Sequence, residues 1–71
     1  MGKFDNITNK EHALKLVGER GILIKQLKQW QDDKEIAIAA VSSFPFALEY
    51  VSDRLKGDKD VVLAAIIQYF Q

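Results

Sequence analysis

Apolar side chains recur three and four residues apart along most of the chain, a spacing that predicts helices. A first helix begins at the capping box Thr8-x-x-Glu11, in which the threonine hydroxyl accepts an amide hydrogen bond and the glutamate reaches back. Gly18 and Gly21 are expected to end it, because glycine adopts the left-handed conformation of a helix C-terminus at least cost. A second helix is predicted over residues 22 to about 31. No stretch alternates cleanly between apolar and polar residues, so strands are not expected.

The second half of the chain predicts three more helices. Residues 34–43 are apolar nearly all round, which is typical of a central helix, and Asp32 and Asp33 supply its cap. Pro45 breaks the chain and suits the first turn of a fourth helix over residues 45–56. Asp58 then caps a last helix over about residues 59–70. The predicted fold class is all-α, with about five short helices in helical hairpins that form a small bundle or a solenoid fragment.

A short repeat with an offset of 25 residues organises these helices. Residues 33–41 read DKEIAIAAV and residues 58–66 read DKDVVLAAI, and four of the nine positions are identical. One helix-turn-helix unit cannot bury both faces of its second helix, so such units stack. We expect a single all-helical domain over residues 1–71. It divides into a flexible start (1–8), a divergent unit (9–32), a second unit (33–57) and a final helix (58–71).

These residues resemble a bacterial and protist helical-repeat domain of unknown function. Its repeats read approximately DKEVVLAAV followed by ALEYAS, and residues 47–52 of this chain read ALEYVS. A Lys-rich stretch that ends in Asn-Gly often links the two helices in that family, whereas residues 42–45 read SSFP here. The family has no established activity, so the resemblance implies a scaffold that binds partners and does not imply chemistry.

Composition narrows the cellular setting and the class of partner. Lys and Arg number 10 and Asp and Glu number 10, so the chain lacks the basic excess that is usual in nucleic-acid binders. Cysteine is absent, which excludes disulfides and thiolate chemistry and favours a reducing cytoplasm. The longest apolar run, residues 61–67, is far shorter than the ~20 residues that span a bilayer. We therefore expect a soluble cytoplasmic protein with no membrane partner.

Candidate catalytic and metal-binding side chains lack convergent partners. His12 is the single histidine, and a helix histidine at the surface is the simpler interpretation. The pair Asp32-Asp33 and the motif Asp58-x-Asp60 lack the span of oxygen ligands that a calcium loop needs, so helix capping explains them better. No nucleophile elbow or phosphate-binding glycine loop occurs. We expect no enzyme, no catalytic residue, no cofactor, no metal and no small-molecule substrate.

The apolar last helix is the most informative feature for function. A terminal repeat normally presents a polar outer face, whereas only Gln68 interrupts the apolar residues of this helix. Either the helix packs inside a compact bundle, or part of it is exposed for a protein partner or a second copy. The second interpretation predicts a non-enzymatic interaction module, and the alternative is a small nucleic-acid-binding regulator of helix-turn-helix type. The candidate partner-binding residues are apolar and aromatic: Trp30, Val62, Ile66, Ile67, Tyr69 and Phe70.

Overall fold

The computed structural model describes residues 7–67, and this part of the chain is helical and contains no strand. The all-α prediction is confirmed. Three longer α-helices alternate with short helical segments, several of them of the tighter 3₁₀ type. In chain order the elements are α1 (Lys10–Glu19), η1 (Gly21–Lys25), η2 (Lys28–Trp30), α2 (Lys34–Ser43), η3 (Pro45–Tyr50), α3 (Asp53–Lys56) and α4 (Lys59–Ile67).

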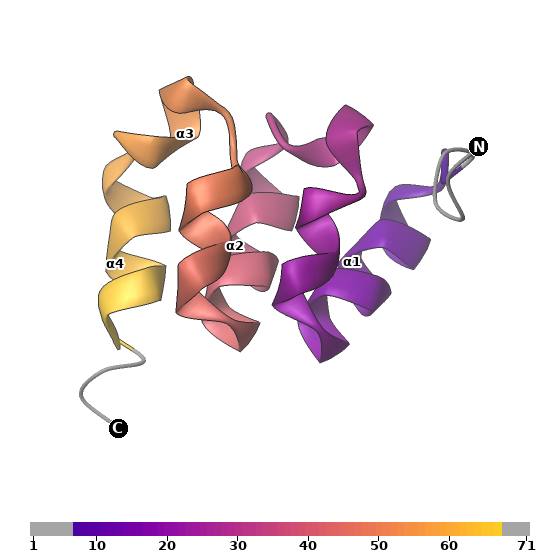
Figure 1. Ribbon diagram of the computed structural model, residues 1–71, viewed down its shortest axis with the longest axis horizontal. Helices are drawn as coiled ribbons and strands as arrows, with labels where there is room; N and C mark the ends of the chain where they lie inside the picture. The colour runs from indigo at the N-terminus through magenta and orange to yellow at the C-terminus, as the bar shows by residue number, and fades with distance from the viewer. Residues whose placement is uncertain (1–6, 68–71) are drawn as a thin grey trace.

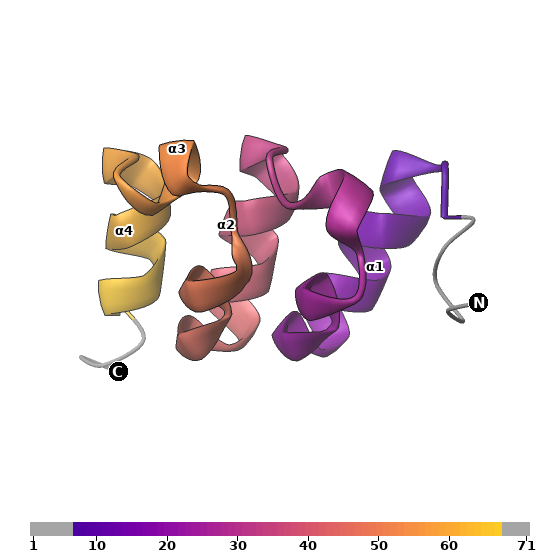
Figure 2. The ribbon, with the colours of Figure 1, turned by 45° about the horizontal axis from the view of Figure 1, so that its top comes forward.

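The longer helices lie side by side in one row, with α2 between α1 and α4 (Figures 1 and 2). The 3₁₀ helices η1 and η3 form a second row. In that row η1 packs against α1 and α2, and η3 packs against α2 and α4. The prediction of a central third helix over residues 34–43 is confirmed, because α2 has these bounds and contacts neighbours on both sides.

Each longer helix begins at a short polar side chain that accepts a hydrogen bond from the amide three residues on. Asn9 accepts from His12 at 3.1 Å, and Asp33 accepts from Ile36 at 3.1 Å. Asp58 plays the same role at the start of α4. The predicted cap at Thr8 is wrong, because Asn9 is an equally good cap one residue later and its side chain makes the bond.

The helix ends differ from the prediction that left-handed glycines stop the chain. No residue in the described part has a positive φ, and α1 continues through Gly18. It ends because Arg20 is extended, with φ −143° and ψ 93°. Gly21 is required for a different reason, since a Cβ there would collide with the Ala40 carbonyl oxygen and lie 2.8 Å from the Phe44 Cβ. The glycine thus lets η1 approach the end of α2 closely.

The predicted continuous helices over residues 22–31 and 45–56 are wrong in both cases. The first is two 3₁₀ helices separated at Leu27, which has ψ 61° and is fully buried. The second is broken at Val51, which is extended with ψ 165° and buried. Ser52 then starts α3, because its hydroxyl accepts from the Leu55 amide at 3.4 Å. In both segments the residue at which the helix breaks, Leu27 or Val51, buries its apolar side chain in the core.

The core runs along the stack and consists of small and branched side chains. Alanine at several α2 and α4 positions allows the helices to pack closely. The buried residues are Ala13, Val17, Ile24, Leu27, Ile36, Ala37, Ala40, Val41, Ala47, Val51, Leu55, Val61 and Ala65.

Candidate functional site

An apolar groove lies between α4 and η3, at the end of the stack away from α1. We call it the C-terminal groove. It has a volume of about 470 Å³, and Glu49 and Lys56 are the charged residues that line it. Its other lining residues are Pro45, Phe46, Leu48, Val62, Ala65 and Ile66.

The walls of the groove expose large apolar side chains to solvent. Phe46 is 64% exposed, and its ring lies 5.6 Å from the ring of Phe44. Ile66 is 42% exposed, whereas Val61 and Ala65 of the same helix point into the core. Of the two interpretations of the apolar last helix, the described part of α4 fits the one in which part of the helix is exposed.

The structure brings together only some of the predicted partner-binding residues. Val62 and Ile66 line the groove, and Ile67 is 49% exposed beside it on α4. Tyr69 and Phe70 lie outside the described residues. Trp30 is not part of this surface, because it belongs to η2 and does not line the groove. Its indole Nε1 donates to the Ile7 carbonyl oxygen at 2.8 Å, so Trp30 fixes the N-terminal end of the stack.

Phe46 and Leu48 complete the groove, and sequence reasoning missed both. The signal that could have identified them is Ala47, the small residue between them, because Ala47 is the side chain that η3 buries. In a continuous α-helix the apolar face would have been assigned to Ala47, Leu48 and Val51 together. The 3₁₀ geometry of η3 instead leaves Phe46 outside and Leu48 only partly buried.

Lysine side chains connect successive long helices at the edge of the row. Lys10 at the start of α1 lies 3.3 Å from the Asp33 carboxylate and 2.8 Å from that of Glu35. These partners raise the pKa of Lys10, chiefly through the hydrogen bond to Glu35 and then that to Asp33. The Lys10 ammonium group is therefore held beside two carboxylates at the start of α2.

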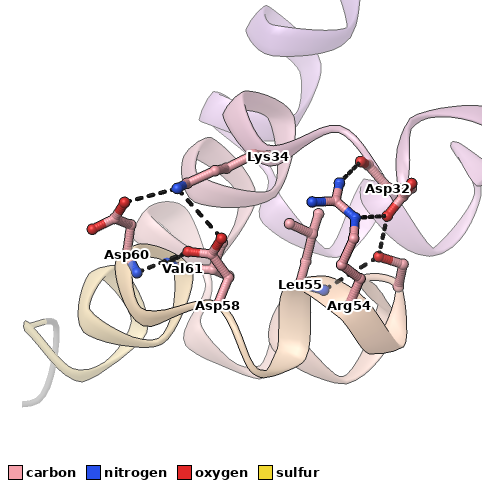
Figure 3. Close-up of polar contacts among 8 residues, drawn as sticks. Asp32, Lys34, Arg54, Leu55, Asp58, Asp60 and Val61 are labelled. Carbon is pink, nitrogen blue, oxygen red and sulfur yellow. Dashed lines mark hydrogen bonds and ion pairs between the residues drawn. The ribbon is translucent and has the colours of Figure 1, made fainter.

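Lys34 at the start of α2 makes the same contact with α4, as Figure 3 shows. Its Nζ lies 3.3 Å from Asp58 and 2.8 Å from Asp60, and the pKa of Lys34 is raised by hydrogen bonds to Asp60 and then Asp58. Burial alone would raise the pKa of Asp58, but amides of Val61 and Asp60 lower it overall, with help from Lys34. Asp58 thus serves as a helix cap and as a lysine partner at once.

Asp32 does not cap a helix, although the sequence pairs it with Asp33. Its carboxylate accepts from the Ser52 hydroxyl and from the Arg54 Nε at 3.0 Å, and Arg54 also donates to the Asp32 carbonyl (Figure 3). The Ser52 hydrogen bond and then Arg54 lower the pKa of Asp32. This cluster ties the start of α3 to the turn before α2.

The remaining candidate side chains are dispersed over the surface. His12 is exposed on α1, and Ser43 accepts from the Gly21 amide at 3.2 Å. Residues 7–67 contain no group of three or more side chains able to hold a metal ion. None of the helices in this range is long and apolar enough to cross a membrane. The nucleic-acid alternative stays a prediction, although Lys10 and Lys34 are already engaged with carboxylates.

Comparison with known proteins finds a matching family for the second half of the chain. A family model described as "Domain of unknown function (DUF4116)" matches residues 33–70, which is more than half of the 71 residues. No curated protein and no solved structure matches the chain. The matched range contains α2, η3, α3 and α4, and with them the whole C-terminal groove.

Proposed function

The chain belongs to the family described as a domain of unknown function (DUF4116), and we propose that it is a non-enzymatic interaction module. It binds a protein partner, or a second copy of itself, through the C-terminal groove. The single observation that carries the proposal is the open apolar groove between η3 and α4, with Phe46 and Ile66 exposed on its walls. Contiguous apolar surface of this kind marks interaction sites in soluble proteins.

The shape of the groove supports a partner helix or short helical segment. An amphipathic helix that binds in a groove places a few large side chains into it, and an aromatic anchor such as Phe46 is typical of an interface centre. Glu49 and Lys56 among the lining residues provide charged groups around the apolar floor, as expected of an interface rim.

The proposal includes a repeated unit and a cellular setting. Two matching sets of ion pairs support the repeated helical unit. Lys10 contacts Asp33 and Glu35, and Lys34 contacts Asp58 and Asp60. The absence of cysteine from the sequence supports a cytoplasmic location.

The proposal is tested by photo-crosslinking in cells with a benzophenone amino acid in place of Phe46. Ile66→Asp places a charge on the groove wall and is expected to reduce a specific crosslink at least tenfold. Leu63→Asp is the matched control, because Leu63 is on the same helix and is 44% exposed but does not line the groove. Equal crosslinking in both variants, or no specific crosslink in the unaltered background, would refute the proposed function.

A further inference from the structure

A third lysine stands in the same position as the two that connect the helices. Lys10, Lys34 and Lys59 each directly follow a capping residue and open a long helix. Lys10 and Lys34 each reach two carboxylates at the start of the next long helix. Lys59 is exposed and, within residues 7–67, has no ion pair. Lys59 therefore presents a cation at the position where Lys10 and Lys34 each bind two carboxylates of a neighbouring helix.

The C-terminal groove also has a covered counterpart inside the molecule. Val62 and Ile66, which are partly or largely exposed in the groove, correspond at the offset of 25 residues to two α2 residues that are fully buried, Ala37 and Val41. In the interior α2 packs against η3 and α4, and both of these α2 side chains are covered. The two α4 side chains lack this cover within the described part of the chain.

We propose that the C-terminal groove and Lys59 together bind a partner protein through a helical unit of the kind formed by η3, α3 and α4. Its short segment fills the apolar groove, and its longer helix starts with the pattern Asp-x-Asp or Asp-x-Glu. The two carboxylates of that helix start receive Lys59. This inference rests on the proposed function and adds the chemistry of the partner.

A second copy of this chain offers a poorer match than such a partner. Its free first helix carries Asn9 as the cap, where α2 and α4 carry aspartate. Three residues after the cap it carries His12, which is exposed, where α2 and α4 carry the fully buried Ile36 and Val61. Burying an imidazole in that position without a partner costs free energy. The first helix thus presents polar residues where α2 and α4 bury apolar ones.

The test uses a labelled peptide of residues 44–67, the segment that covers the equivalent face inside the chain. A hydrocarbon staple joins positions 63 and 67, which are exposed and outside the groove lining, so that the peptide's helix is formed before binding. Fluorescence anisotropy follows its titration with the full chain. We expect saturable binding, weakened about fivefold by K59E in the chain, because an exposed pair contributes modestly.

Rescue identifies the contact. The peptide variant D60K is expected to restore binding to the K59E chain, because it exchanges the charges across the interface. A peptide that displaced the chain's own α4 would instead meet Lys34, and D60K would then weaken binding to every chain. Failure of the stapled peptide to bind, or of D60K to rescue K59E, overturns the inference.

The remaining outcomes separate this inference from the proposed function. Binding that is lost with Ile66→Asp but indifferent to K59E leaves the groove as an interface and refutes the role of Lys59. Binding unchanged by both variants refutes the inference, and the crosslinking experiment decides the proposed function separately. A concentration-dependent dimer of the full chain in sedimentation velocity, weakened by K59E and restored in K59E/E11K, would replace the partner by a second copy.

Discussion

Replacing Gly21 with alanine tests the close contact between η1 and the end of α2. The added methyl group would collide with the Ala40 carbonyl oxygen and lie 2.8 Å from the Phe44 Cβ and 3.0 Å from the Phe44 nitrogen. Two of these three atoms belong to the backbone, so the strain cannot be relieved by rotating a side chain. The helix end or η1 itself must move, and the 3.2 Å hydrogen bond from the Gly21 amide to Ser43 is strained with it.

The expected cost of Gly21→Ala is the difference of two opposing effects. Overpacking a well-packed site destabilises a protein by roughly 1–3 kcal/mol. The lower entropy of the unfolded alanine chain returns about 0.4–1 kcal/mol. We expect a net loss of about 1–2 kcal/mol in the free energy of unfolding. For a domain of this size that corresponds to a decrease in Tm on the order of 4–16 °C.

Gly18→Ala is the matched control, and it is expected to change stability in the opposite direction. Gly18 lies inside α1, and a Cβ there meets nothing within 4 Å. Alanine in such a helix position stabilises by about 0.5–1 kcal/mol. Urea and thermal unfolding followed by circular dichroism measure both variants. If Gly21→Ala were as stable as the original chain or more stable, the close contact between η1 and α2 would be wrong.

Two further predictions concern helix capping and pH. Asn9→Ala is expected to lower the free energy of unfolding by about 1 kcal/mol because the capping bond is lost, whereas Thr8→Ala in the same urea assay changes it little. Equal losses would return the cap to Thr8. The pKa of Asp32 lies below the ordinary 3.8 through Ser52 and then Arg54, so its contribution is present above that pH and is lost as pH falls through the lowered folded value. Asp32→Asn should therefore flatten the acid limb of stability measured by urea unfolding across a pH series, and an unchanged limb would contradict this linkage.

The candidate site was only partly predictable from the sequence. The unbroken apolar run of the last helix pointed to Val62, Ile66 and Ile67, and all three are partly or largely exposed at the groove end of the stack. Phe46 could not be assigned, because its exposure depends on η3 being a 3₁₀ helix packed between α2 and α4. Residue type alone groups Trp30 with these residues in the sequence. Its indole is instead committed to the Ile7 carbonyl, a contact across 23 positions that no local pattern encodes.

The sequence by itself determined the all-helical class and the bounds of α2. Asp33 begins that helix and Pro45 prevents its continuation, and both act through neighbouring backbone groups. Only the tertiary structure decided where the short segments break. Leu27 and Val51 leave helical geometry because the core that buries them contributes more free energy than another turn of isolated short helix. The same long-range packing covers Ala37 and Val41 of α2, whereas the equivalent Val62 and Ile66 of α4 stay partly or largely exposed within residues 7–67, and this difference defines the groove.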